Sequence, residues 1–232
     1  MTDSALRELA DDPSSRKRFF KMMGGAGAVS AFSVFLAACG DDKKKDKTTS
    51  TAASGGSGSD ADVKSDLHIL NYALTLEYLE TEFYKEVIAS GIVKDAKVAS
   101  IAKKFGETEQ MHVEALKSTI TSMGGTPVAA PKTKFQPTIA KGLKTVLDTA
   151  ATVENLGAAA YLGAAGLIKS KDVLAAALTI HSVEARHAAA LNTLVGRGFG
   201  LKGGLSGSLP DGAFAKGMDE ASVLAAVKPF LA

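Results

Sequence analysis

Two Glu-x-x-His motifs are the residues of this sequence best suited to do chemistry. They are Glu109-Gln-Met-His112 and Glu184-Ala-Arg-His187. On an α-helix, side chains three residues apart lie on the same face, so the carboxylate and imidazole of each motif can reach one metal region. Oxygen-rich ligation with two imidazoles suits iron or manganese better than a metal that prefers thiolates. The motifs therefore predict binding of one of these two metals.

An internal repeat extends this set to two further glutamates, Glu77 and Glu154. Residues 77–84 match residues 154–161, with Glu, Leu and Tyr at the same offsets. Residues 109–116 match residues 184–191, with Glu, His and Leu at the same offsets. Two similar helical hairpins would pack about a pseudo-twofold axis, each giving one Glu and one Glu-x-x-His. The repeat selects Glu77 over Glu80, because the counterpart of Glu80 is Gly157.

All four selected glutamates fall within the apolar stripes of predicted helices, so they are expected to face the core. Burying one bare carboxylate costs several kcal/mol or forces its protonation, and four together are untenable without cations. Four Glu supply a charge of −4, which two divalent metal ions balance, while neutral imidazoles add ligands without changing that balance. The sequence therefore predicts a dinuclear centre of two iron ions, with manganese as the alternative metal.

The elements that must position these residues are helices, and nothing between them is typical of a strand. Amphipathic periodicity predicts four long helices, over residues 66–90, 95–123, 137–169 and 171–195. Ser65 is the expected N-cap of the first helix and Gly91 its stop signal. Short joins make antiparallel hairpins of helices one and two and of helices three and four. Residues 124–136 could span about 43 Å when extended, so we predict an all-α four-helix bundle with one long crossover.

Three other segments flank or follow the predicted bundle, which occupies residues 65–197. Residues 39–64 are a linker, first charged and then rich in Ser, Thr and Gly, with too little apolar surface to fold. Residues 198–232 form a Gly-rich tail, in which residues 219–231 are expected to make a short amphipathic helix.

The first 38 residues resemble an export signal. The basic run Ser15-Arg16-Lys17-Arg18 precedes an apolar stretch that ends in Leu36-Ala37-Ala38-Cys39. The run resembles the twin-arginine motif with Lys17 in place of the second arginine, and the end resembles a bacterial lipobox with Cys39 as the lipidated residue. These features predict an exported lipoprotein, held on the outer face of the cytoplasmic membrane or in the periplasm. The alternative is a single membrane anchor with an ordinary cysteine.

Composition excludes several other classes of protein. The 232 residues are 46% hydrophobic and 22% charged, which is enough for a globular core. A net charge of +2 gives no case for binding nucleic acid. A single Cys excludes a disulfide scaffold, a Cys-based zinc site and a rubredoxin-like iron centre within this chain.

On these motifs, residues 65–195 resemble a ferritin-like di-iron carboxylate domain. The segment 183–188, Val-Glu-Ala-Arg-His-Ala, resembles the bacterial subgroup that includes desiccation-related proteins. The resemblance implies six metal ligands, which are Glu77, Glu109, His112, Glu154, Glu184 and His187. It leaves open whether Glu109 and Glu184, or Glu77 and Glu154, bridge the two metals.

The resemblance also bears on four residues outside the ligand set. Tyr84, seven residues after Glu77, matches the tyrosine beside the di-iron centre of ferritins and is the candidate catalytic residue. The alternative for Tyr84, as for Tyr161, is a core aromatic whose hydroxyl hydrogen-bonds a carboxylate. Gly157 lies where rubrerythrins carry an extra Glu, so a rubrerythrin-type peroxidase is not expected. Glu80 and His181 are candidate auxiliary ligands, with a rim carboxylate and a packed imidazole as their alternatives.

The leading interpretation is an exported lipoprotein whose two iron ions react with dioxygen or peroxide, in ferroxidase-like iron handling or stress protection. A manganese centre that disproportionates peroxide is a second enzymatic option. The rival from another class is a non-catalytic stress or scaffold lipoprotein whose metal only stabilises the bundle. The expected partners are dioxygen or peroxide and the membrane, with a homodimer left open and nucleic acid excluded.

Overall fold

A computed structural model describes residues 59–200 and 205–232, and these residues contain helices but no β-strand. The helices are α4 (Asp60–Ser90), α5 (Ala96–Ser122), α6 (Gln136–Ile139), α7 (Leu143–Ala165), α8 (Lys171–Leu194) and α9 (Glu220–Val227), followed by a 3-10 helix over Lys228–Phe230. The expected all-α class is confirmed. The expected signal segment over residues 1–38, with Cys39 and most of the linker, lies outside the described residues.

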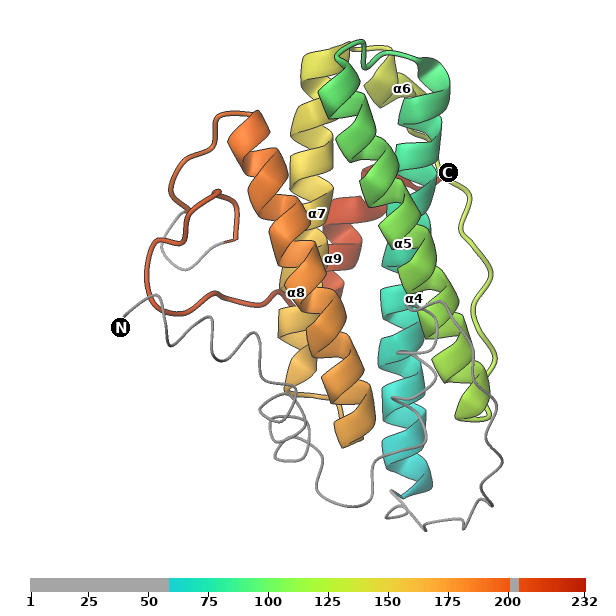
Figure 1. Ribbon diagram of the computed structural model, residues 1–232. Helices are drawn as coiled ribbons and strands as arrows, with labels where there is room; N and C mark the ends of the chain where they lie inside the picture. The colour runs from blue at the N-terminus through green and yellow to red at the C-terminus, as the bar shows by residue number, and fades with distance from the viewer. Residues whose placement is uncertain (1–58, 201–204) are drawn as a thin grey trace, which may run out of the picture. The chain divides into compact units, whose positions relative to one another are not determined.

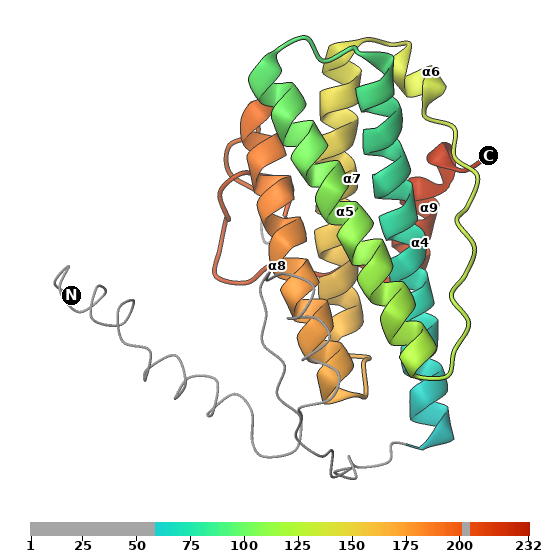
Figure 2. The same ribbon diagram turned by 45° about the vertical axis from the view of Figure 1, so that its right-hand side comes forward.

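Four long helices form an antiparallel bundle (Figures 1 and 2). α4 pairs with α5 and α7 pairs with α8, and the two hairpins meet chiefly where α4 packs on α7. The segment between α5 and α6 runs along the outside of the bundle from one end to the other, as both views show. This is the predicted long crossover.

The crossover is attached to α4 along its length. Near its start, Asn71 accepts a hydrogen bond from the Val128 N–H (2.8 Å) and donates one to the Thr126 carbonyl (3.3 Å). Near its end, the Gln136 side chain donates to Glu86 (2.8 Å). The two Asn71 bonds satisfy backbone groups that the irregular segment would otherwise leave unpaired, and the Gln136 bond joins side chains.

The first helix begins earlier than the sequence predicted. Its N-cap is Ser59 rather than Ser65, and it forms a capping box, in which the Asp62 N–H donates to the Ser59 hydroxyl and the Ser59 N–H donates to the Asp62 carboxylate. Two helix-end N–H groups are satisfied together in this way, so the earlier start is favoured. Residues 60–64, expected to be linker, are therefore helical.

The predicted third helix, over residues 137–169, is two helices. The short α6 ends at Ile139, and α7 begins after Gly142, whose φ of +100° is a conformation that only glycine adopts without strain. The chain therefore turns sharply before it enters α7. α7 itself stops at Ala165, and the following residues form the loop to α8.

That loop is held by a buried carboxylate on α4. Asp66 is only 1% exposed and accepts hydrogen bonds from the backbone N–H groups of Lys169 (2.8 Å) and Ser170 (2.7 Å). Ser170 in turn caps the first turn of α8 through the Val173 N–H. Asp66 thus ties the beginning of the first hairpin to the turn of the second.

The tail wraps the bundle on the side of α7. The Met218 N–H donates to the Ala159 carbonyl (2.9 Å), and a side chain at Gly163 would collide with the Met218 backbone, so the approach needs glycine. α9, shorter than the predicted 219–231, buries Val223 and Val227. The last residues pair with the crossover, where Lys134 N–H donates to the Phe230 carbonyl (2.9 Å). The tail therefore fastens the crossover to the second hairpin.

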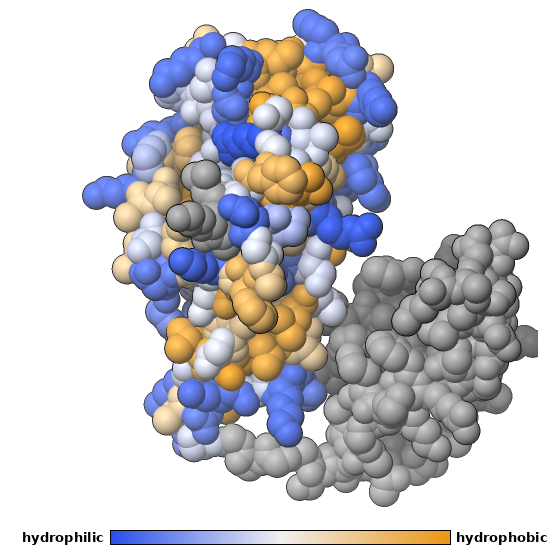
Figure 3. Space-filling view, turned by 90° about the vertical axis from the view of Figure 1, so that its left-hand side faces the viewer, coloured by the Kyte–Doolittle hydropathy of each residue, from blue (hydrophilic) through white to orange (hydrophobic). Residues whose placement is uncertain are grey.

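The segment between α8 and α9 presents apolar side chains to solvent. Phe199 is 72% exposed, Leu209 52% and Phe214 86%. Figure 3 shows this side of the molecule, where apolar patches lie among charged residues. Among the helices that the structure describes, none is long and apolar enough to cross a membrane.

The Asp66 contact generates a stability prediction. Replacing Asp66 by Ala leaves the partly buried N–H groups of Lys169 and Ser170 without their acceptor, so Asp66→Ala is expected to lower the free energy of unfolding by about 2 kcal/mol. Asp66→Asn keeps one acceptor oxygen and is expected to cost about half as much. Urea denaturation of the metal-free protein measures both. The exposed Asp60→Ala is the control and should change stability by less than about 1 kcal/mol; equal losses for Asp66 and Asp60 would contradict the assignment.

Candidate metal centre

The six residues that the sequence selected meet in the middle of the bundle. Each hairpin contributes one glutamate from its first helix and one Glu-x-x-His pair from its second: Glu77 from α4, Glu109 and His112 from α5, Glu154 from α7, and Glu184 and His187 from α8. The four carboxylates are at most 1% exposed, and the two imidazoles are 8% and 7% exposed. The carboxylates are therefore cut off from bulk water, and the imidazoles keep only a small exposed edge.

The cluster contains two overlapping groups that could each hold a metal ion. In each group, one ligand atom per residue lies within 4.8 Å of every other. The groups are Glu77, Glu109, His112 and Glu184, and Glu109, Glu154, Glu184 and His187. Glu109 and Glu184 belong to both, whereas Glu77 and Glu154 each belong to one. The geometry thus favours Glu109 and Glu184 as the shared pair, a choice that the sequence left open.

The two imidazoles turn the same ring nitrogen toward the carboxylates. His112 Nδ1 lies 2.9 Å from Glu109, 3.1 Å from Glu184 and 3.3 Å from Glu77. His187 Nδ1 lies 2.8 Å from Glu109 and 3.2 Å from Glu154. One nitrogen carries at most one proton, so it cannot donate well to two or three carboxylates at once.

Within the described residues, several of these atoms make no hydrogen bond of good geometry, although some lie within 3.2 Å of an imidazole nitrogen or a carboxylate oxygen. They are Glu109 Oε1, Glu154 Oε2, both carboxylate oxygens of Glu184, and His187 Nδ1. Buried polar atoms in proteins nearly always have a hydrogen-bond partner. Buried lone pairs that converge on one point without an N–H or O–H group are therefore typical of a cation-binding site. The donor set is all oxygen and imidazole nitrogen, which fits iron or manganese.

Glu77 and Glu154, the two glutamates that belong to one group each, are here called the outer glutamates. Each accepts a hydrogen bond from a tyrosine of the other hairpin. The Tyr84 hydroxyl on α4 donates to Glu154 Oε1 on α7 (2.5 Å), and the Tyr161 hydroxyl on α7 donates to Glu77 Oε1 on α4 (2.5 Å). This exchange follows the pseudo-twofold relation of the repeat. Each bond fixes one carboxylate oxygen and leaves the other turned toward an imidazole.

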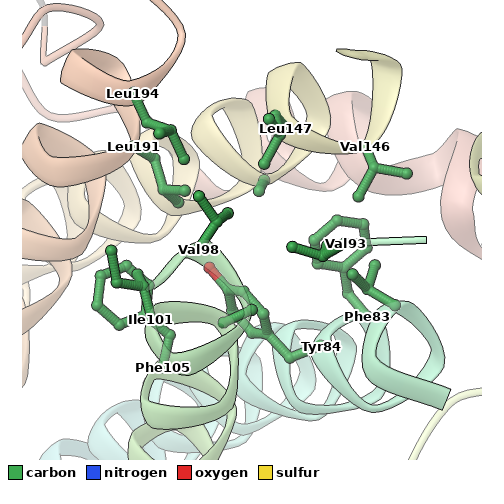
Figure 4. A pocket seen from close by; sticks show the side chains of 13 residues that line it. Phe83, Tyr84, Val93, Val98, Ile101, Phe105, Val146, Leu147, Leu191 and Leu194 are labelled. Carbon is green, nitrogen blue, oxygen red and sulfur yellow. The ribbon is translucent and has the colours of Figure 1, made fainter. Parts of the chain in front are cut away.

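An apolar cavity lies beside the cluster at the end of the bundle where α4 and α8 finish (Figure 4). Its volume is about 20 Å³, which is room for one molecule of about the size of water or dioxygen. Phe105 lines it and stacks on the His187 ring, with centroids 3.8 Å apart. Tyr84 lines the cavity as well, so the cavity borders a tyrosine that hydrogen-bonds Glu154 and a phenylalanine that stacks on His187.

Burial and mutual repulsion set the ionisation of the cluster. Burial raises the pKa of Glu77, Glu154 and Glu184, and most strongly that of Glu184. Glu109 is buried too, but its contacts with His112 and His187 outweigh that effect and lower its pKa to about 2. For His187, burial opposes the charged form, yet contacts with Glu109 and Glu154 raise its pKa to about 9. Without metal, the cluster therefore retains protons that a metal ion would displace.

The structure separates the two auxiliary candidates. His181 turns away from the cluster, and its Nδ1 lies 3.0 Å from the Ala158 carbonyl on α7. Glu80 belongs to neither four-residue group but is buried, with 2% exposure. Sequence reasoning did not foresee the stacking of Phe105 on His187. Phe105 lies two helical turns before His112 on the same stripe, a signal that it faces the core but not that it meets α8.

Comparison with known protein families supports this architecture. A ferritin-like domain family matches residues 65–197, which is more than half of the chain and spans all four long helices. The chain belongs to the ferritin-like domain family. A search of curated proteins finds no match. The match covers every residue of this ferritin-like cluster and stops before α9, while the finer resemblance to desiccation-related proteins stays a prediction.

The pKa shifts predict opposite pH trends for the metal-free and metal-loaded protein. A raised His187 pKa stabilises the fold below its ordinary value of 6.5, and this stabilisation is lost as the pH rises through about 9. Raised carboxylate pKa values act in the same direction, because the fold favours their protonated form. Metal binding instead displaces protons, so the stabilisation that it adds should grow with pH.

Thermal unfolding between pH 5 and pH 9 measures both trends, with and without a chelator. The metal-free protein is expected to lose stability toward pH 9, while the increase in melting temperature on adding Fe(II) without oxygen becomes larger. The stabilisation that comes from the low pKa of Glu109 is fully present throughout this window, because it is lost only as the pH falls from about 4.5 through about 2. A metal-dependent increase that stays constant with pH would contradict displacement of protons by the metal.

Proposed function

We propose that this protein binds two iron ions in the ferritin-like cluster and oxidises Fe(II) with dioxygen or peroxide, in iron handling or stress protection. The observation that carries the proposal is the overlap of two four-ligand groups through Glu109 and Glu184. A shared pair of carboxylates holds two cations close together, which a single isolated site would not require. The donor set accepts manganese as well, so the metal itself is part of the test.

The residues divide into three roles in this proposal. Glu109 and Glu184 would be shared by both metal ions, while Glu77 with His112 and Glu154 with His187 would each hold one of them. Tyr84 and Tyr161 hold the outer carboxylates in place, and Tyr84 is the candidate catalytic tyrosine because it also borders the cavity. When bound, iron supplies the electrons that reduce the oxidant.

The size of the cavity supports a small oxidant. A space of about 20 Å³ lined by apolar side chains holds about one molecule of the size of water, which favours a small oxidant over a bulky organic substrate. Phe105 and its neighbours also keep bulk water from the His187 side of the cluster, which strengthens electrostatic contacts within it. Dioxygen or peroxide acting on Fe(II) therefore fits the cluster better than oxidation of a bulky molecule.

The proposal places the protein outside the cytoplasm on a lipid anchor. Its support is the basic run before an apolar stretch and the Leu36-Ala37-Ala38-Cys39 end that resembles a lipobox. A chain exported through the twin-arginine route would cross the membrane folded and could carry metal loaded in the cytoplasm.

Anaerobic titration with Fe(II), followed by admission of oxygen, tests the function. Elemental analysis of the purified protein is expected to give two iron ions per chain, and oxygen uptake should depend on Fe(II). Glu77→Gln and Glu154→Gln should each slow the oxidation by at least about tenfold, because each removes a ligand atom. Glu114→Gln, an exposed position on α5, is the control and should leave the rate unchanged.

Other results would favour the rival functions. Two tightly held metal ions without oxygen uptake, and with only the melting temperature changed in the variants, would favour a non-catalytic stress or scaffold protein. Manganese retained in purified protein, with peroxide disproportionation and no oxidation of Fe(II), would favour a catalase-like reaction. Absence of any bound metal would contradict the proposal outright.

A further inference from the structure

Glu80 is a fifth carboxylate in the middle of the bundle, and nothing in the six-ligand site accounts for it. It is 2% exposed, one helical turn after Glu77 on α4. Among the residues that the structure describes, the Glu80 carboxylate takes part in no side-chain hydrogen bond or ion pair, whereas His112 approaches both Glu77 and Glu184 nearby. A buried carboxylate in this situation costs several kcal/mol unless a cation or a proton neutralises it.

Gly157 on α7 shows where this carboxylate lies. A Cβ at position 157 would be 2.8 Å from Glu80 Oε1 and 3.0 Å from Glu184 Oε2. The two carboxylate oxygens therefore share the small space above Gly157, and any side chain there would displace one of them. Glu184 Oε2 is one of the buried oxygens without a hydrogen bond. Glu80 therefore places a second carboxylate oxygen beside one that already lacks a donor.

The internal repeat explains why the space is free. Position 80 in the first hairpin corresponds to position 157 in the second, three residues after Glu77 and Glu154 respectively. Residues three apart on a helix share a face, so both positions point at the same cluster from opposite sides. Only one side carries a carboxylate, and the other carries the one residue small enough to leave room for it.

Glu80 changes the charge balance between the carboxylates and the metal ions. Five ionised carboxylates carry a charge of −5. Two divalent ions carry +4 and leave one negative charge over, whereas two trivalent ions carry +6 and leave one positive charge over. A carboxylate that coordinates the pair lowers the free energy of the trivalent state more than that of the divalent state, because the attraction grows with the cation's charge.

We propose that Glu80 is a seventh ligand of the metal pair, bound on the Glu184 side of the cluster, and that it stabilises the oxidised pair over the reduced pair. This inference rests on the proposed di-iron site. It assigns to Gly157 the role of clearing the space in which the Glu80 carboxylate binds.

Redox titration of the iron-loaded full chain tests the proposal with a readout other than activity. Glu80→Gln is nearly isosteric but uncharged, so the midpoint potential of the bound iron is expected to rise relative to the unmodified protein. The affinity for Ga(III), a redox-inert trivalent probe, is expected to fall by about tenfold or more, a larger factor than for Co(II). Unfolding of the metal-free variant serves as the folding control, and removal of the buried charge should make it at least as stable as the unmodified protein.

Two further variants complete the design. Exchanging the pair, Glu80→Gly with Gly157→Glu, moves the carboxylate to the second hairpin and removes the contact of position 157 with Glu80. A Cβ at position 157 stays 3.0 Å from Glu184 Oε2, so this variant is expected to restore part of the potential and of the Ga(III) affinity. Glu82→Gln is the matched control, since Glu82 lies on the same helix but pairs with Lys85 at the surface (3.0 Å); it should change neither value.

The outcomes separate this inference from the proposed function. If the unmodified protein binds two metal ions and Glu80→Gln alters neither the potential nor the ratio of Ga(III) to Co(II) affinity, Glu80 is a protonated packing residue and the inference is wrong. If the unmodified protein binds no metal ion, the proposed function itself fails.

Discussion

Five carboxylates lie in the middle of an otherwise apolar bundle, and the structure depends on how their charge is balanced. The cationic side chains in contact with them, within the described part of the chain, are His112 and His187. Two imidazoles supply at most two positive charges. The remaining charge must be met by protons, which the raised pKa values of the carboxyl groups represent, or by metal ions.

The two hairpins, related by the pseudo-twofold repeat, fix where the carboxylates and imidazoles lie. Each hairpin alone carries one outer glutamate and one Glu-x-x-His pair, which is half a site. The Tyr84–Glu154 and Tyr161–Glu77 bonds cross from one hairpin to the other, so neither half can hold its outer carboxylate without its partner. The crossover and the tail on the outside of the bundle, together with the buried Asp66 contact, keep the two halves in register.

The sequence predicted the bundle and its six central residues because helical spacing and the repeat constrain both. It could not select the bridging pair, because that choice depends on distances between helices rather than within them. The start of α4 was predicted at Ser65, since Ser59 and Ser65 both suit an N-cap and only the bonds to Asp62 distinguish them. The repeat selects Glu77 over Glu80 as a ligand, because the counterpart of Glu80 is Gly157. The same glycine leaves space opposite for the Glu80 side chain, which only the distances between α4 and α7 reveal.

Crystals grown with Fe(II) and measured at the iron absorption edge would show whether the buried carboxylates hold metal. We expect two anomalous peaks per chain, one among Glu77, Glu109, His112 and Glu184 and one among Glu109, Glu154, Glu184 and His187. A map without peaks in the bundle, with these carboxylates paired by ordered water or by one another, would contradict a dinuclear metal site. The core would then be balanced by protons alone.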